Sequence, residues 1–154
     1  MESAKYTILV VDDEEMIRYL VTSFLSKPGH SCLTAIDGVD ALDKMKRNKI
    51  DAVITDIKML TVDGITLASE ISRQYPEIPI MVMTAFGEEY SEGTAVSVGA
   101  REVIKKPFSL DQFAVRLNKM INDSETIKRM KNGKNVDESV QDLMSELEKT
   151  LKDS

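Results

Sequence analysis

The fold of this chain is indicated first by one segment, Ile8-Leu9-Val10-Val11-Asp12-Asp13-Glu14-Glu15. Its apolar half is short and rich in β-branched residues, as in a strand buried on both faces of a parallel sheet. Its acidic half places like charges side by side at the carboxyl end of that strand. This crowding is unfavourable unless a cation lies among the acids or one of them holds a proton. Ligands bind at this same edge of open parallel α/β sheets, so we predict a cation-binding acidic pocket there.

The remaining pattern predicts a sheet of five strands. They are expected at residues 6–11, 31–35, 52–55, 80–83 and 103–105. The segments between them carry apolar stripes at helical spacing, and Met16, Leu20 and Val39 belong to these stripes. Strands that alternate with helices at this rhythm indicate βαβ units with right-handed crossovers. We therefore predict an α/β fold with a doubly wound parallel sheet.

The end of the chain has a different pattern. We predict a domain over residues 1–123 and a helical extension or linker over residues 124–154. Ile127 and Met130 continue the fifth helix, and Asn132-Gly133 ends it. A second amphipathic helix follows, with apolar residues at Val136, Val140, Leu143, Met144, Leu147 and Leu151. Two interpretations of this helix are open: packing on its own domain, or pairing with another chain or a downstream module.

Composition excludes several classes of protein. An apolar share of 42% in 154 residues is enough for a core, and the net charge of −6 argues against direct nucleic-acid binding by this domain. The longest apolar runs, such as 78–83, are far too short to cross a bilayer, and no signal peptide is visible at the N-terminus. The single Cys32 excludes an internal disulfide. We expect a cytoplasmic protein without a membrane partner.

Residues able to do chemistry follow four of the predicted strands. Asp12 and Asp13 follow the first strand, Asp56 the third, Thr84 the fourth and Lys106 the fifth. Parallel strands bring these ends into one crevice. Three carboxylates suit Mg²⁺, which keeps water ligands for a phosphate oxygen. A carboxylate beside this cation can attack phosphorus to give an acyl phosphate, while the hydroxyl and the ammonium bind the phosphoryl oxygens.

These residues, with their neighbours, resemble the motifs of a known family. The motifs are Ile8-Leu9-Val10-Val11-Asp12-Asp13-Glu14, Val53-Ile54-Thr55-Asp56-Ile57-Lys58-Met59, Met83-Thr84-Ala85 and Lys106-Pro107-Phe108. Together they are similar to the receiver (response-regulator) domain over roughly residues 5–123. The resemblance implies a flavodoxin-like strand order, 2-1-3-4-5, in the five-stranded parallel sheet, with a C-terminal helical extension.

The resemblance also implies roles for individual residues. Asp56 would be the phosphoacceptor. Asp12, Asp13 and Asp56 would hold Mg²⁺ together with the main-chain carbonyl of Lys58. Thr84 and Lys106 would sense the phosphoryl group and couple it to the fourth strand, the fourth helix and the fifth strand.

Partners follow from the same resemblance. A sensor histidine kinase or a histidine phosphotransfer protein would donate the phosphoryl group. The chain would promote its own phosphorylation and slow hydrolysis without being a turnover enzyme. Phosphorylation would bias a two-state surface formed by the fourth helix, fifth strand and fifth helix. A homodimer partner or an effector would bind there or on the C-terminal helix.

Two positions depart from the family pattern. Leu60 stands where receivers usually carry proline, so the loop before residue 64 is expected to be less rigid. Val103 stands where a tyrosine or phenylalanine commonly swings inward on activation. Valine has no ring to swing. Signalling is therefore expected to rely on movement of the loop over residues 84–93.

Two rival functions remain open at this stage. One is a small Mg²⁺-dependent phosphatase or phosphotransferase with an aspartyl intermediate. Such enzymes commonly need a second acid two residues after the nucleophile, and this chain has Lys58 there. The other is a pseudo-receiver used as a docking scaffold. The complete set of acids argues against this function, whereas Val103 at the usual aromatic position leaves it open. A stand-alone receiver and a fragment of a longer regulator are equally compatible with the sequence.

Overall fold

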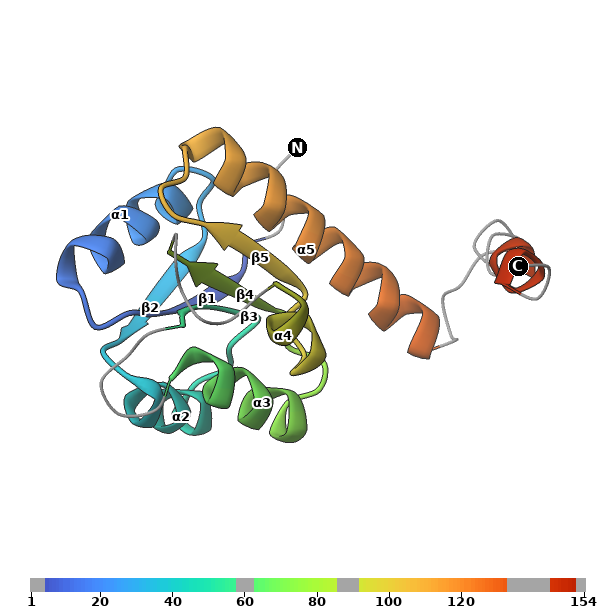
Figure 1. Ribbon diagram of the computed structural model, residues 1–154, viewed down its shortest axis with the longest axis horizontal. Helices are drawn as coiled ribbons and strands as arrows, with labels where there is room; N and C mark the ends of the chain where they lie inside the picture. Colours follow the sequence, from blue (N-terminus) through green and yellow to red (C-terminus); the bar gives the residue numbers. More distant parts are fainter. Residues whose placement is uncertain (1–4, 58–62, 86–91, 133–144, 152–154) are drawn as a thin grey trace. The chain divides into compact units, whose positions relative to one another are not determined.

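The structure, a computed structural model, describes residues 5–57, 63–85, 92–132 and 145–151. Strands and helices alternate along the chain as the sequence predicts (Figure 1). The elements are β1 (Thr7–Val11), α1 (Glu15–Ser26), β2 (Ser31–Ala35), α2 (Gly38–Arg47), β3 (Ala52–Asp56), α3 (Gly64–Gln74), β4 (Ile80–Thr84), α4 (Glu92–Ser97), β5 (Glu102–Lys105) and α5 (Leu110–Asn132).

The sheet has five strands in the order β2-β1-β3-β4-β5, and all neighbouring pairs are parallel. The predicted order 2-1-3-4-5 is therefore confirmed. Val11 pairs with Thr55, and Asp56 pairs with Met83, so β1, β3 and β4 end at neighbouring positions. The residues that follow these strands consequently share one edge of the sheet.

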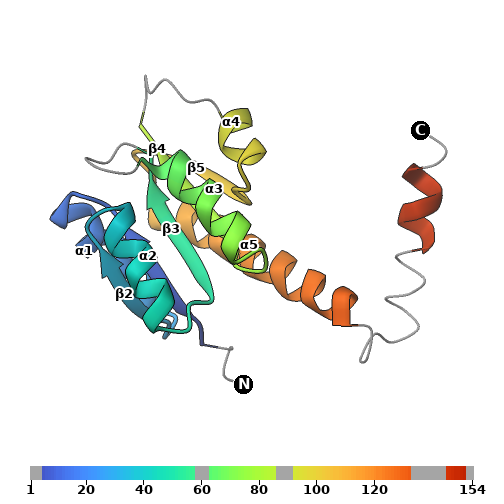
Figure 2. The same cartoon turned by 90° about the horizontal axis from the view of Figure 1, so that it is seen from below.

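Helices cover both faces of the sheet, because side chains in a strand alternate between the faces. Leu9 and Val11 belong to one apolar cluster with residues of α2 and α3, among them Met45 and Leu67. Ile8 and Val10 belong to the opposite cluster with residues of α1 and α5: Val21, Leu25, Phe113 and Leu117. Figure 2 shows α2 and α3 together on one side of the sheet. This layering is the doubly wound fold that the sequence predicts.

Side-chain caps mark the starts of α2 and α5. The Asp37 carboxylate accepts a hydrogen bond of 2.8 Å from Asp40 N at the start of α2. At the start of α5, Ser109 Oγ accepts from Gln112 N at 3.1 Å, and Gln112 Oε1 accepts from Ser109 N at 3.0 Å. These reciprocal bonds form a capping box, which satisfies amides that the first helical turn leaves unpaired.

Three residues of the predicted apolar stripes lie at the surface instead of in the core. Met16, Leu20 and Val39 are 80%, 39% and 60% exposed. Burial in α1 falls on Val21 and Leu25, and Ile17 packs against the same cluster. Met16 and Leu20 therefore lie on the flank of the buried face, and so does Val39 beside the buried Ala41 and Met45 of α2. Helical spacing shows that a helix has an apolar face, but a broad stripe does not tell which part of it meets the sheet.

The chain divides into two compact units, Met1–Ile121 and Asn122–Ser154. Helix α5 ends at Asn132, where the sequence predicts a break. Residues 145–151 are helical, with Leu147 57% and Leu151 74% exposed. The other apolar residues of the predicted C-terminal stripe, 136–144, lie outside the described residues. None of the helices described here combines the length and the apolar character needed to cross a membrane.

Candidate functional site

Three aspartates meet at the carboxyl edge of the sheet. Asp12 follows β1 and is fully buried, Asp56 ends β3 and is 4% exposed, and Asp13 is exposed. One carboxylate oxygen from each lies within 4.8 Å of the others. Oxygen ligands at this spacing suit a divalent cation such as Mg²⁺. The three side chains that the sequence assigns to a metal site are thus brought together.

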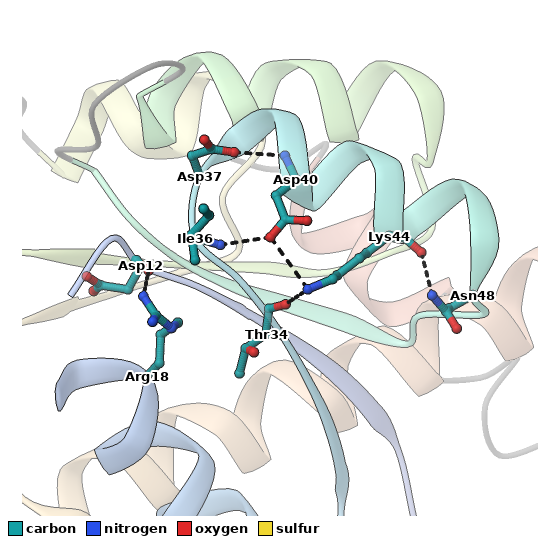
Figure 3. A network of polar contacts seen from close by, with 8 residues as sticks. All are labelled: Asp12, Arg18, Thr34, Ile36, Asp37, Asp40, Lys44 and Asn48. Carbon is teal, nitrogen blue, oxygen red and sulfur yellow. Dashed lines mark hydrogen bonds and ion pairs between the residues drawn. The ribbon is translucent and has the colours of Figure 1, made fainter. Parts of the chain in front are cut away.

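Asp12 is held by main-chain and side-chain hydrogen bonds. Its N–H donates to Ala35 O at 3.1 Å, and its Oδ1 accepts from Glu14 N at 2.9 Å. Its carbonyl oxygen accepts a hydrogen bond of 2.8 Å from Arg18 Nη1, which Figure 3 shows reaching the strand end from α1. Among the described residues, no hydrogen bond satisfies the buried second carboxylate oxygen, Oδ2, and its nearest cationic group is Lys106 Nζ at 3.5 Å. A buried anionic oxygen that is only loosely paired fits a pocket that takes a cation.

The end of β2, which holds the Asp12 amide, is itself fixed to α2. Ile36 N donates to Asp40 Oδ2 at 3.0 Å, and Lys44 Nζ donates to Thr34 O (Figure 3). Lys44 Nζ also lies 3.5 Å from Asp40 Oδ2. These contacts limit movement of the strand end beside the acidic pocket.

Lys106 brings a positive charge to the acids. Its Nζ lies 3.2 Å from Asp56 Oδ1 and 3.5 Å from Asp12 Oδ2. Its N–H donates to Thr84 O at 2.6 Å, which joins the end of β4 to the residue that follows β5. Thr84 is 5% exposed. The sequence assigned Lys106 and Thr84 to the same crevice, and the structure places both at this edge.

Aromatic packing anchors the loop that carries Lys106. The Phe108 ring stacks on Phe113 of α5 with a centroid distance of 5.7 Å, and Phe113 contacts Phe24 of α1 at 5.6 Å. Aromatic pairs at such distances add stability beyond the area that they bury. The backbone between Lys106 and Phe108 is therefore tied to both helices on that face of the sheet.

Burial and charge shift the pKa of two groups in the pocket. Burial raises the pKa of the Asp12 carboxyl above its ordinary 3.8; the Glu14 N–H and Lys106 lower it, and Asp13 and Glu14 raise it. Burial alone would lower the pKa of Lys106, but the Asp56 and Asp12 carboxylates outweigh it, so this pKa lies above its ordinary 10.5. Lys106 is consequently an ammonium ion at neutral pH.

Other positions singled out from the sequence are placed as follows. Val103, at the position where receivers commonly have an aromatic residue, is 7% exposed and packs in the apolar core. Lys58, whose carbonyl the sequence assigns to the metal, lies outside the described residues, as do Leu60 and most of the loop over residues 84–93. Sequence reasoning missed Arg18, although its place near the start of α1, shortly after the acidic run, was a usable signal.

Asp12→Asn is expected to raise the free energy of unfolding at about pH 7 in Mg²⁺-free buffer. The folded-state pKa of Asp12 is raised, so its ionised carboxylate costs stability above the unfolded pKa. This cost disappears as pH falls through the folded pKa toward 3.8, so the advantage of the variant should shrink near pH 4. Urea unfolding at both pH values measures it. Asp43→Asn, on the exposed side of α2, is the control, and a less stable Asp12→Asn at neutral pH contradicts the expectation.

Known proteins share both the sequence pattern and this fold. The family model described as response regulator receiver domain matches residues 8–118. The transcriptional regulator PhoP of Bacillus subtilis is 35% identical over 118 residues, which are 77% of this chain and 49% of that protein. The regulator NtrC of Proteus hauseri is 29% identical over 92% of this chain and 30% of its own length. This chain therefore spans half or less of these two curated relatives.

Solved structures give the same result. The receiver domain of NtrX from Brucella abortus is 35% identical, with a TM-score of 0.71 over 75% of this chain and 98% of that one. The chemotaxis protein CheY4 of Vibrio cholerae is 28% identical, with a TM-score of 0.71 over 76% of this chain and 99% of that one. The family model matches residues 8–118, which include the acidic edge of the sheet, so the chain belongs to the response regulator receiver domains of two-component signalling.

Proposed function

We propose that this chain is a phosphorylation-dependent signalling switch that accepts a phosphoryl group on Asp56 in a Mg²⁺-dependent step. One observation carries the proposal. The nearly buried Asp56 carboxylate lies with two further aspartates at metal-ligand spacing and 3.2 Å from the Lys106 ammonium. Positioning and charge neutralisation are the main requirements of phosphoryl transfer, and this arrangement supplies both.

The chemistry assigned to each residue follows from its place. An Asp56 oxygen attacks the phosphorus of a phosphohistidine, so that a P–O bond forms while the P–N bond breaks and its electron pair returns to the imidazole. Water later attacks the acyl phosphate and releases inorganic phosphate and the carboxylate. Asp12, Asp13 and Asp56 would hold Mg²⁺, which when bound would offset charge on the phosphoryl oxygens. Lys106 binds one of these oxygens as an ammonium ion, and the Thr84 hydroxyl binds another.

The partner that donates the group is a sensor histidine kinase or a histidine phosphotransfer protein. Both carry the phosphoryl group on an imidazole, and the family to which this chain belongs supports this assignment. We infer that the chain is a switch and not a turnover enzyme. The position two residues after Asp56 is Lys58, so it offers no second carboxylic acid for general acid catalysis.

The output surface is proposed to include β5 and α5. A groove of about 760 Å³ runs between them, and Lys106 lines it as well as the acidic pocket. Glu102 also lines the groove; it is 7% exposed and paired with Arg116 at 3.3 Å and Lys119 at 3.1 Å. A movement of the Lys106 side chain in the acidic pocket would therefore also change the shape and charge of this groove. A homodimer partner or an effector protein is the proposed occupant of the surface.

The proposal is tested with a small-molecule phosphodonor such as acetyl phosphate. In the presence of Mg²⁺, intact-mass spectrometry should show the mass of one added phosphate, and chelation of the metal should prevent the addition. Sustained release of phosphate from a generic phosphomonoester would favour a phosphatase instead. Absence of modification with saturating Mg²⁺ would leave a docking scaffold as the better description.

A further inference from the structure

Arg18 makes an unexpected contact beside the acidic pocket. It is half-buried on α1, and its Nη1 donates a hydrogen bond of 2.8 Å to the main-chain carbonyl of Asp12. Four acidic side chains, residues 12–15, lie close to it in the chain. A guanidinium prefers a carboxylate, with which it forms two strong parallel bonds. Among the described residues, however, Arg18 forms no ion pair and engages this carbonyl (Figure 3).

The carbonyl that Arg18 binds belongs to the peptide unit between Asp12 and Asp13. Because a peptide unit is planar, holding its oxygen fixes the orientation of the whole unit. Asp12 has further anchors, since its N–H and its Oδ1 are both hydrogen-bonded. The exposed Asp13 carboxylate has none among the described residues. The direction in which the Asp13 side chain points therefore depends on the orientation of this peptide unit.

We propose that Arg18 is a positioning residue for the metal site, which fixes the peptide unit between Asp12 and Asp13 and so presents the Asp13 carboxylate to Mg²⁺. This inference rests on the proposed function, because it assumes that the three aspartates bind the cation. Arg18 would act through the Asp12 carbonyl and not as a ligand of the metal or the phosphoryl group. It acts by keeping one ligand in place before the cation arrives, which lowers the cost of ordering that ligand.

Arg18 could affect Mg²⁺ binding through its charge or through the hydrogen bond that it donates. The two roles predict opposite changes in Mg²⁺ affinity when Arg18 is removed. A positive side chain next to a cation site repels the cation, so its removal should tighten Mg²⁺ binding if charge alone matters. If Arg18 holds the Asp13 ligand, its removal should weaken Mg²⁺ binding despite the loss of repulsion. The sign of the change in affinity thus separates the two roles.

The test is a titration of the whole chain with MgCl₂, followed by ¹H–¹⁵N NMR shifts of the amides near Asp13. The chain has no tryptophan, so fluorescence offers a poorer signal. Arg18→Met is expected to raise the Kd for Mg²⁺ about fivefold, or ~1 kcal/mol, the usual contribution of one hydrogen bond. Arg18→Lys keeps a donor and should recover part of the affinity. Arg47→Met, which removes an exposed arginine paired with Asp43 on α2, should change the Kd less than about twofold.

Unfolding in Mg²⁺-free buffer is measured in parallel, so that a loss of fold is not mistaken for a loss of ligand. If Arg18→Met does not fold, Arg18→Ala, which also lacks a donor, takes its place with the same expected sign. An unchanged or lower Kd in the variant, with normal Mg²⁺ binding by the unaltered chain, overturns the role of Arg18 alone. Absence of Mg²⁺ binding by the unaltered chain would overturn the proposed function together with this inference.

Discussion

Asp56→Asn should abolish the addition of phosphate from acetyl phosphate and Mg²⁺. An amide oxygen is a far weaker nucleophile than a carboxylate, so the attack on phosphorus is lost. The amide has nearly the same shape as the carboxylate, and its oxygen can still accept the hydrogen bond that Ile57 N donates at 2.9 Å. The fold around β3 is therefore expected to survive. Intact-mass spectra of the two proteins, treated side by side, measure the effect.

Two further variants make this result specific. Asp43→Asn removes the same charge from an exposed position of α2 and should be phosphorylated like the unaltered chain. Asp12→Asn keeps Asp56 but removes one proposed metal ligand, so it should need much more Mg²⁺ for the same rate. If Asp56→Asn still gains the mass of a phosphate, the phosphoacceptor lies elsewhere, and peptide mapping should then search Asp13 first because it is the exposed acid of the pocket.

Much of this site could be predicted because the fold has a simple geometric rule. In a parallel sheet, the residue that follows each strand reaches the same edge, so short apolar runs ending in Asp12, Asp56 and Lys106 were enough to bring them together. The runs themselves are recognisable because β1, β3 and β4 are buried on both faces and are mostly apolar.

Other features depend on packing that no local pattern contains. The exposure of Met16 follows from how α1 is rotated about its axis, which turns Val21 and Leu25 to the sheet and leaves Met16 on the flank. The bond from Arg18 to the Asp12 carbonyl requires a helix start and a strand end to meet at one particular angle. The burial of Glu102 depends on Arg116 and Lys119, which lie 14 and 17 residues away in the chain. Contacts of this kind become visible only when the elements are placed in space.

Gly64→Ala is expected to destabilise the chain and to disturb the phosphoacceptor, although helix propensity alone predicts the opposite. Gly64 is the first residue of α3, and alanine in a helix is favoured over glycine by about 0.5–1 kcal/mol. A Cβ at this position, however, would lie 2.0 Å from the Asp56 carbonyl oxygen and 2.8 Å from Ile57 Cα. These are backbone atoms, so they cannot move aside as the end of a side chain does.

Relief of this overlap requires α3 and the end of β3 to separate. The hydrogen bond of 2.7 Å from Gly64 N to Ile57 O would then stretch, and the backbone that presents the Asp56 carboxylate would shift. Overpacking of this kind commonly costs about 1–3 kcal/mol, which exceeds the gain from propensity. We expect a loss of about 2 kcal/mol in urea unfolding. Phosphorylation should slow at least about tenfold, because small displacements of reacting groups reduce rates strongly.

Gly29→Ala separates this local effect from general destabilisation. Gly29 has a φ of +93°, so alanine there is strained, but its Cβ would meet Lys5 Cε at an ordinary 3.5 Å. The strain of a left-handed residue costs about 1–2 kcal/mol, close to the loss expected for Gly64→Ala. Gly29 precedes β2 at the amino edge of the parallel sheet, whereas the three aspartates lie at the carboxyl edge, so its variant should be phosphorylated at the normal rate. If both variants lose equal stability and are phosphorylated equally fast, close packing of Gly64 against Asp56 is not what holds the phosphoacceptor in place.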